Sequence, residues 1–516
     1  MSIIKISATS RTIQTCVLSV GSLFTICLSL AMATILSRLL NKEDYGTFRQ
    51  VIYVYTCMAV VFQVGLPKAT SYFLPKLSPE QGKTTLRQIA AILFASGLVF
   101  GGLLYFGADT IGVLLKNPAL PKLLRVYSPI PIFLMPTLAL EGVCMTFSMA
   151  GLYTLFQIVT KFLALGAVCL PIYFGYTMEQ AIQLWCAVSF LSLCLALFVM
   201  FRPYWGIKAA ASRYGLKDVF AFSMPMLFVS VIGAMLMSAD RFFISRYFGA
   251  KIFAEYINGA IEFPLITIVA GSAATVLLPE FSRLYEIKES TNEMLAIWAR
   301  AMNKAAMVLY PVAVFCFIYA EDIVSLLYSS RYSSSTVYFK IYLLLTIVRI
   351  VSYMPLMVGI REMRSYVIAH IAACIIMWGG GFLLCNYTHK PVYVALCFVF
   401  SIFVTTSVCF IRISQKFNVR ILDLAPYRQL FIYSALSIAS GCLAWLATAA
   451  VPSNLLYLRM TRLAAGCIIF TFAYIMISKV ARVNSLEFLW PLFVRLGIVE
   501  KQDNLCAEQA VSNDKQ

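Results

Sequence analysis

Apolar runs long enough to cross a lipid bilayer recur along the whole chain, and they limit its possible folds more than any other feature. A transmembrane helix needs about 20 mostly apolar residues, because each residue advances about 1.5 Å through a hydrocarbon layer of about 30 Å. With 61% hydrophobic and 12% charged residues, the chain carries more apolar surface than a soluble core could bury. The sequence predicts an all-α polytopic membrane protein with about fourteen spans, at roughly 15–36, 48–67, 89–107, 126–149, 152–174, 181–201, 219–239, 252–278, 301–320, 337–360, 366–384, 392–411, 430–451 and 463–477.

The positive charges indicate a membrane topology. A net charge of +18 would suggest nucleic-acid binding in a soluble protein, but here Lys and Arg are spread through short connections between apolar runs. If both termini are cytoplasmic, the inside connections hold about 22 of these cations and the outside connections about 11. The positive-inside rule therefore predicts cytoplasmic termini, and no nucleic-acid partner is expected.

Several kinds of chemistry leave no signature in the sequence. The fifteen cysteines include no CxxC pair and no Cys/His cluster at metal-ligand spacing, so neither a disulfide framework nor a metal site is predicted. A Walker A motif is also missing, which argues against direct use of ATP. We expect no cofactor, and these features favour a secondary transporter or facilitator.

An internal repeat divides the chain. Ser37–Leu40 and Asp44–Gly46 follow the first run, and the similar Ser245–Phe248 and Glu255–Ile257 follow the seventh. An offset of six spans preserves orientation, so the two halves form a parallel repeat, and substrate would bind between them. The predicted parts are an N-terminal lobe with helices 1–6, a C-terminal lobe with helices 7–12, helices 13–14 with an interfacial segment, and a cytoplasmic tail, at 1–212, 213–415, 416–500 and 501–516.

The run Ser37–Phe48 resembles the start of bacterial Wzx-type oligosaccharide flippases, which share the MOP superfamily with multidrug (MATE) exporters and the lipid II flippase. Asp240-Arg241 and Leu278–Arg283 look like the same family. The resemblance implies two six-helix lobes forming a V that opens alternately to either side. It also implies export of a polyprenyl-diphosphate-linked glycan through the bacterial plasma (inner) membrane for O-antigen, capsule or exopolysaccharide synthesis. Membrane lipids and polysaccharide polymerase or assembly proteins are the expected partners.

Three cations lie inside or at the start of predicted spans, namely Arg49, Lys161 and Arg349. A charge within a membrane is costly and usually faces a partner or a wet cavity. Arginine binds phosphate through paired hydrogen bonds and lysine acts as a point charge, so we predict that all three bind the anionic headgroup. The alternative is structural: Arg49 extends to the interface, Arg349 pairs with a carboxylate and Lys161 reaches a helix end.

The intramembrane acids Glu141, Asp240 and Glu262 are candidates for ion coupling. A carboxylate facing a cavity in a membrane can exchange a proton, or bind sodium, once in each transport cycle. The alternative is that Asp240 and Arg241 only anchor the end of their span, and that Glu141 and Glu262 neutralise Arg349 or Lys161.

Prolines inside predicted spans indicate bent helices, because each proline removes one backbone hydrogen bond. Bending suits a cavity that opens and closes, although prolines are also common in ordinary membrane helices. They are Pro131, Pro136, Pro225, Pro264, Pro311 and Pro355.

Three other functions fit parts of the sequence. A MATE-type multidrug or cation antiporter would share the architecture, but it would favour an acid-rich aromatic cavity. A membrane-embedded polysaccharide polymerase or ligase would be an enzyme with a sizeable external loop, and no external connection here is that long. In a non-transporting scaffold, neutralising the buried charges would leave function unchanged.

Overall fold

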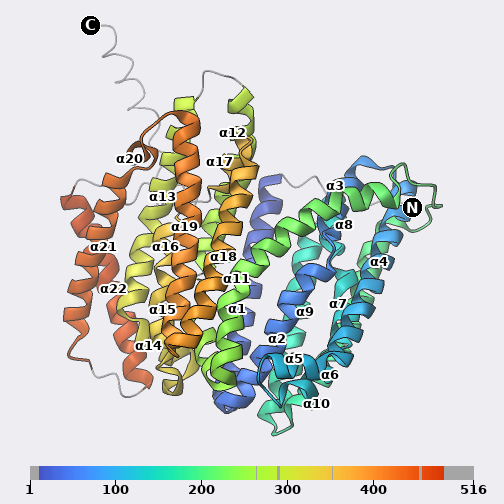
Figure 1. Cartoon of the computed structure of the whole chain (residues 1–516), viewed down its shortest axis with the longest axis horizontal. Helices are drawn as coiled ribbons and strands as arrows, with labels where there is room; N and C mark the ends of the chain where they lie inside the picture. Colours follow the sequence, from blue (N-terminus) through green and yellow to red (C-terminus); the bar gives the residue numbers. More distant parts are fainter. Residues whose placement is uncertain (1–10, 263, 287–290, 351–352, 452–455, 482–516) are drawn as a thin grey trace. The chain divides into compact units, whose positions relative to one another are not determined.

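The computed structural model describes residues 11–262, 264–286, 291–350, 353–451 and 456–481, and these residues form helices without any β-strand. Figure 1 shows their arrangement. The first ten helices are α1 (Arg11–Leu39), α2 (Lys42–Phe62), α3 (Leu66–Phe73), α4 (Pro79–Phe106), α5 (Ala108–Leu114), α6 (Leu120–Tyr127), α7 (Ile130–Thr137), α8 (Leu140–Thr146), α9 (Ala150–Tyr173) and α10 (Met178–Phe201). The later helices are α11 (Leu216–Gly259), α12 (Pro264–Glu286), α13 (Thr291–Ile318), α14 (Ala320–Tyr328), α15 (Ser335–Leu343), α16 (Leu345–Val348), α17 (Met354–Gly359), α18 (Met363–Tyr387), α19 (Pro391–Phe417), α20 (Ile421–Leu424), α21 (Tyr427–Thr448) and α22 (Leu456–Val480).

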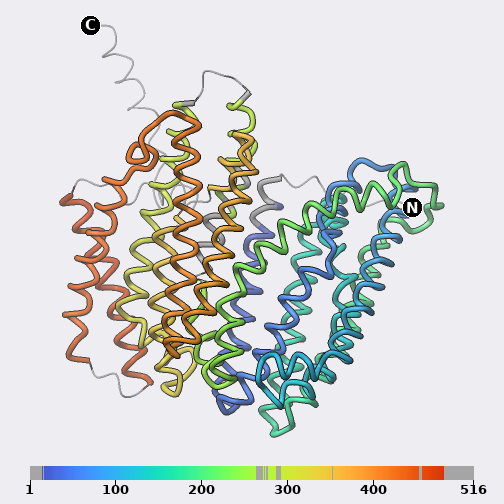
Figure 2. Tube along the Cα trace, in the orientation of Figure 1, coloured from blue at the N-terminus to red at the C-terminus, as the bar shows by residue number. Residues whose placement is uncertain are grey.

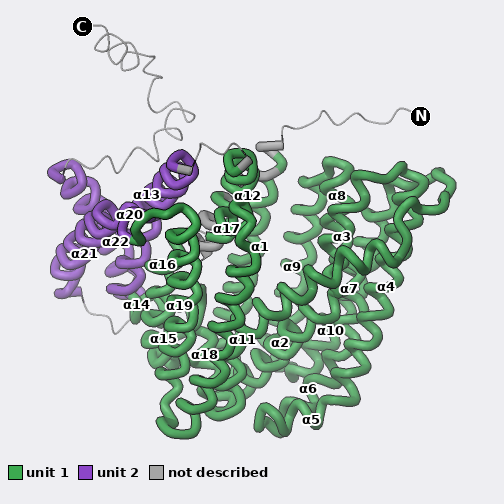
Figure 3. Tube along the Cα trace, turned by 45° about the horizontal axis from the view of Figure 1, so that its top comes forward, with its two compact units in different colours: residues 1–291, 320–421 green, residues 292–319, 422–516 purple. Residues whose placement is uncertain are grey.

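The chain divides into two compact units, coloured separately in Figure 3. Unit 1 comprises residues 1–291 and 320–421, and unit 2 comprises residues 292–319 and 422–516. Unit 1 therefore contains all six charged residues singled out in the sequence. The lobe boundaries expected at 212 and 415 stay a prediction.

Polar residues start several of the long helices. The Asn41 side chain accepts a hydrogen bond from the Asp44 backbone amide at 2.8 Å and caps α2. Ser78 caps α4 just before Pro79, and Thr177 forms a capping box with Gln180 at the start of α10. Such side chains satisfy the backbone amides that have no partner in the first helical turn, so local sequence fixes where these spans begin.

The all-α polytopic fold is confirmed. Within the described ranges, ten helices are long and apolar enough to cross a membrane, or twelve when two bent pairs each count as one span. The sequence predicts about fourteen. The two remaining runs, 252–278 and 337–360, fall on helices that are divided into shorter pieces, α11 with α12 and α15 with α16 and α17.

Both halves of the internal repeat contain an interrupted stretch, but at different places. After the first repeat motif, α2 and α3 meet at a bend of 46°, where Val64 and Gly65 both have positive φ. A Cβ on Gly65 would lie 2.6 Å from the Ser223 carbonyl oxygen, so this bend requires glycine for both its backbone angle and its close contact. After the second motif, α11 ends at Gly259 and α12 begins at Pro264.

Helix α11 is itself bent within unit 1. Gly249 has a φ of 77° and a ψ of 177°, so the segments before and after it are two helices joined at an angle. Figure 2 shows α11 in green as one long, curved segment.

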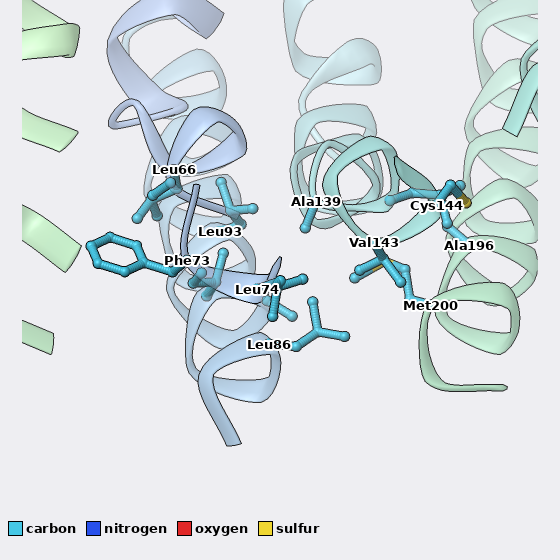
Figure 4. Close-up of a cluster of buried hydrophobic side chains, with 14 of the residues drawn as sticks. Leu66, Phe73, Leu74, Leu86, Leu93, Ala139, Val143, Cys144, Ala196 and Met200 are labelled. Carbon is cyan, nitrogen blue, oxygen red and sulfur yellow. The ribbon is translucent and has the colours of Figure 1, made fainter. Parts of the chain in front are cut away.

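Apolar packing holds α3, α4, α8 and α10 together in unit 1. Leu66, Leu86, Val143 and Met200 are buried in one cluster, drawn in Figure 4. Gly142 brings the backbones of α8 and α3 together, since a Cβ there would lie 2.8 Å from the Ser71 nitrogen. Helices in a membrane gain little from expelling water, so close packing of this kind is the main stabilising contribution.

Unit 2 is built from α13, α21 and α22. Phe470, Tyr474 and Ala444 are buried between these helices, and the Tyr319 and Thr448 hydroxyls are 2.8 Å apart. Gly466 packs against the ring of Tyr319, where a Cβ would come within 2.6 Å. A small residue thus permits the close approach of membrane helices.

Candidate functional site

A largely apolar cavity with a few polar groups lies among the N-terminal helices α1, α7, α9 and α10, and Lys161 lines it. Its volume is about 250 Å³, which is at the low end for small-molecule sites. The cavity could hold a diphosphate or a single sugar ring, but not a whole lipid-linked oligosaccharide. The lining residues that carry its polar and aromatic chemistry are Thr25, Thr137, Phe156, Gln157, Thr160, Lys161, Trp185, Ser189 and Ser192.

The cavity offers both hydrogen-bond donors and acceptors. Ser189 and Ser192 donate their hydroxyl hydrogens to the carbonyls of Trp185 and Val188, each at 2.8 Å. Their oxygens keep lone pairs that can accept hydrogen bonds from a ligand. Lys161 supplies an ammonium group with three donors. Such a lining suits a molecule that combines an anionic group with hydroxyl groups.

No carboxylate of the described residues forms an ion pair with Lys161, which is exposed. The neighbouring acid Glu141 instead accepts a hydrogen bond from the Tyr153 hydroxyl at 3.2 Å. Gln157 donates to that hydroxyl at 2.8 Å and also lines the cavity. Glu141 is therefore linked to the cavity through two side chains of α9, and its charge does not directly neutralise Lys161.

Arg349 and Glu262 form an ion pair in unit 1. This contact matches the structural alternative for both residues, in which the arginine pairs with an intramembrane carboxylate. The pair is partly open, since the Arg349 side chain is 25% exposed and the Glu262 side chain 30%. Arg349 also contacts the Met237 sulfur at 3.3 Å.

Asp240 is fully buried and accepts two tyrosine hydroxyls at one carboxylate oxygen, Oδ2. Tyr256 donates at 2.6 Å, and Tyr342 of α15 donates as well. The other oxygen, Oδ1, is buried and accepts no hydrogen bond from any described residue. The alternative that Asp240 and Arg241 only anchor the end of their span stays a prediction, although α11 continues beyond them to Gly259.

Arg49 lies on α2 beside the ring of Tyr45, with 5.9 Å between its guanidinium carbon and the ring centre. Its Nε atom is buried and has no hydrogen-bond partner among the described residues. Arg49, Lys161 and Arg349 thus occupy three different settings, and their joint role in headgroup binding stays a prediction.

Helices α2 and α11 meet along a row of polar contacts that we call the α2–α11 seam. It consists of the Lys42–Glu255 ion pair, the Tyr45–Asn258 hydrogen bond at 2.7 Å and the Gln50–Ser245 hydrogen bond at 2.8 Å. Between them, Gly46 lies directly against α11, where a Cβ would be 2.0 Å from the Ala250 carbonyl oxygen. The seam joins the first half of the repeat to the second.

The sequence identifies the charged residues inside the predicted spans, but it does not identify the side chains that surround them. Tyr153, Gln157 and Lys161 follow one another at four-residue spacing on α9 and therefore share one helix face. That spacing could have indicated a polar face towards a cavity. Nothing in the sequence placed Tyr342 beside Asp240, because the two are far apart in the chain.

Solved structures similar to this chain are membrane transporters. The lipid II flippase MurJ, in an inward closed conformation, is 14% identical with a TM-score of 0.67, over 90% of this chain and 98% of MurJ. An inward-facing multidrug resistance MATE transporter is 14% identical with a TM-score of 0.65, over 76% of this chain and 94% of that one. A MOP superfamily transporter from Pyrococcus furiosus, described as having a binding pocket of reverse polarity, is 14% identical with a TM-score of 0.56, over 78% of this chain and 94% of that one.

At these identities the structures establish the fold, which is that of MOP superfamily transporters. No curated protein matches the chain in sequence. A sequence profile of the family described as polysaccharide biosynthesis protein matches residues 35–337, more than half of the chain. The chain therefore belongs to this family of polysaccharide biosynthesis proteins, as the resemblance of its motifs indicated.

Proposed function

We propose that this protein is a flippase that moves a polyprenyl-diphosphate-linked oligosaccharide across the plasma membrane by alternating access. The observation that carries the proposal is Lys161, a cation without a described carboxylate partner that lines a cavity together with several hydroxyl side chains. Lys161 would contact phosphate oxygens, and the Ser189 and Ser192 oxygens would accept hydrogen bonds from sugar hydroxyls. Membership of a polysaccharide biosynthesis family supports this class of substrate.

A polar path through the protein is necessary for such a substrate. A glycan cannot cross hydrocarbon unaided, because each buried polar group without a partner costs several kcal/mol. The lipid tail would stay in the bilayer while the headgroup passes through the protein. An inside-negative potential favours outward movement of two negative charges by about 4.6 kcal/mol per 100 mV, at about 2.3 for each charge.

Further parts of the proposal concern location and coupling. The excess of Lys and Arg in alternate connections supports cytoplasmic termini in an inner membrane. A proton or sodium ion would bind at Asp240, whose Oδ1 atom is buried without a described partner. Glu141, which accepts a hydrogen bond from Tyr153, and Glu262, which forms an ion pair with Arg349, are the other candidates. Polysaccharide polymerase or assembly proteins would take over the exported glycan.

The second candidate function is multidrug export, because MATE transporters share the fold. Their cationic substrates would favour acidic and aromatic groups in the binding cavity. The cavity of this chain contains Trp185 and Phe156, but its charged residue is Lys161. A cation there repels cationic drugs, so we favour the anionic lipid.

Depletion of the protein tests the function directly. We expect the lipid-linked glycan to accumulate on the cytoplasmic leaflet and surface polysaccharide to fall, because the headgroup loses its path through the membrane. Leaflet-specific labelling of the glycan would measure this. Export at the normal rate after depletion would contradict the proposal, and loss of drug resistance without a change in glycan would favour the alternative.

Substitution of Lys161 tests the cavity. We expect Lys161→Ala to lower glycan transport about 10- to 100-fold, because a hydrogen bond to a charged group contributes about 1.5–3 kcal/mol. Transport in proteoliposomes would be compared with that of Lys161→Arg, which keeps the charge. Lys208→Ala is a matched control, since Lys208 is exposed and lies outside the cavity. Equal transport by Lys161→Ala and Lys208→Ala would remove Lys161 from the substrate path.

A further inference from the structure

Gln157 lines the cavity of Lys161 and also ends a chain of hydrogen bonds that begins at Glu141. The Tyr153 hydroxyl donates to Glu141 Oε2 at 3.2 Å, and Gln157 Nε2 donates to the Tyr153 oxygen at 2.8 Å. Glu141 lies in the first turn of α8, and Tyr153 and Gln157 lie one turn apart on α9. We call these three side chains the Glu141 relay.

The relay fixes which end of the Gln157 amide faces Tyr153. A carboxylate has no hydrogen to donate, so the single hydrogen of the Tyr153 hydroxyl is used on Glu141. The Tyr153 oxygen can then only accept, and only the NH2 group of the Gln157 amide can donate to it. The Gln157 carbonyl oxygen, Oε1, is therefore turned away from Tyr153. It accepts no hydrogen bond from any described residue, and it is not sealed from solvent.

The hydroxyl groups that line the cavity also use their hydrogens elsewhere. Each donates to a backbone carbonyl of its own helix at 2.7 or 2.8 Å, which leaves its oxygen as an acceptor. A hydroxyl can rotate and donate to a ligand instead, whereas the two ends of the Gln157 amide cannot exchange places without breaking the relay. Gln157 is thus an acceptor of fixed polarity. The hydroxyl residues are Thr25, Thr137, Thr160, Ser189 and Ser192.

We propose that Gln157 recognises a hydrogen-bond donor on the sugar ring nearest the diphosphate, and that Tyr153 and Glu141 are positioning residues that keep its oxygen turned towards that donor. The inference rests on the proposed function, in which Lys161 contacts a phosphate. Residues four apart on a helix are neighbours, with about 5–6 Å between their Cβ atoms. A phosphate at Lys161 therefore brings the sugar attached to it beside Gln157.

The chemistry of this contact excludes part of the possible ligands. A sugar hydroxyl or an amide N–H group can donate to Gln157 Oε1. A ligand that offers only an acceptor at the same place meets the lone pairs of the carbonyl oxygen and binds more weakly. The Glu141 relay thus makes the cavity selective for one polarity of hydrogen bond.

The experiment measures lipid binding to the detergent-solubilised full chain. The probes are polyprenyl diphosphate, the same lipid carrying one glucose, and analogues of the glucose lipid in which one hydroxyl is replaced by fluorine. Fluorine is close in size to a hydroxyl but donates no hydrogen bond. In the parent protein we expect the glucose lipid to bind more tightly than the bare lipid, and one fluorinated analogue to bind about 5- to 10-fold more weakly than the glucose lipid. Gln157→Leu should bind that analogue and the glucose lipid equally.

Tyr153→Phe and Glu141→Gln test the positioning role. Either change frees the Gln157 amide to turn its NH2 group towards the fluorine, so we expect the difference between the two lipids to shrink to about twofold or less. A loss of stability alone would weaken the binding of both lipids and leave their ratio as in the parent protein. A parental ratio in either variant would therefore overturn the role of the relay.

Tyr173→Phe is the matched control for Tyr153→Phe. Tyr173 lies on the same helix, is exposed and lies outside the cavity, so its variant should keep the parental ratio. A change of the ratio in Tyr173→Phe equal to that in Tyr153→Phe would also overturn the proposal, because the effect would then not depend on the hydrogen bond to Gln157.

The outcomes separate this inference from the proposed function. If the parent protein binds the bare and the glucose lipid equally, or binds every fluorinated analogue as tightly as the glucose lipid, Gln157 does not recognise the sugar. This inference is then wrong and the flippase proposal stands. If the parent protein binds neither the bare lipid nor the glucose lipid, both proposals fail.

Discussion

Gly46→Ala is expected to lower both the unfolding temperature and the transport rate, the latter by at least about tenfold. The new Cβ would lie 2.0 Å from the Ala250 carbonyl oxygen and 2.6 Å from its carbon, so α2 and α11 must move apart. Overpacking of this kind typically costs about 1–3 kcal/mol, and more where backbone is in the way. Separation would also lengthen the Tyr45–Asn258 and Gln50–Ser245 hydrogen bonds of the α2–α11 seam. Thermal unfolding in detergent and transport in proteoliposomes would measure the two effects.

Gly102→Ala is the matched control for this prediction. Gly102 is also in a helix, but no atom lies within 4 Å of the position its Cβ would take. Alanine is favoured over glycine in a helix by about 1 kcal/mol, so this variant should be as stable as the parent protein or more so. If Gly46→Ala behaves like Gly102→Ala, then α2 and α11 do not pack as closely as described.

Asp240→Leu is expected to destabilise the protein by about 1–3 kcal/mol and to abolish transport. The Tyr256 and Tyr342 hydroxyl oxygens lie 3.3 Å apart, so one of them can still donate to the other. Leucine removes the shared acceptor of the Tyr256 and Tyr342 hydroxyls, both of which are buried. Each buried donor left without a partner costs about 1–3 kcal/mol. Asp240→Asn keeps an acceptor oxygen and should fall between the two proteins in stability. Chemical unfolding of the detergent-solubilised variants would measure the difference.

A triple variant distinguishes packing from ion coupling at Asp240. Replacing Tyr256 and Tyr342 with phenylalanine beside Asp240→Leu removes the unpartnered hydroxyls, and we expect most of the lost stability to return. Transport should remain absent if Asp240 carries a coupling ion. A stable triple variant that transports at the parental rate, with the same dependence on the proton and sodium gradients, would exclude that role.

The polytopic fold could be predicted because each span is a run of about 20 apolar residues, which can be recognised in the sequence without knowledge of the rest of the fold. Where spans break depends on more than proline. Pro225 and Pro311 lie inside continuous helices α11 and α13, whereas Pro264 and Pro355 start new helices after a break. A proline removes one hydrogen bond, and the packing around it decides whether the helix bends or ends.

In the candidate site, too, the sequence predicts the local features, whereas the contacts between helices depend on packing. Arg349 and Glu262 were singled out separately because a charge within an apolar run is conspicuous, and pairing was one of the alternatives for each. Their mutual contact depends on two helix breaks far apart in the chain. Asp240 was placed at the end of a span because the apolar run stops there, but its helix continues. Burial against tyrosines of α11 and α15 allows a polar stretch to remain inside unit 1.

Gly249 divides the α2–α11 seam into two parts. Ser245 precedes the bend, whereas Glu255 and Asn258 follow it. No atom lies within 4 Å of the place a Cβ would occupy on Gly249, so no side chain packs directly against this joint. The two parts of the seam belong to separate helical segments of α11. The contacts of one segment with α2 can therefore break while those of the other segment remain.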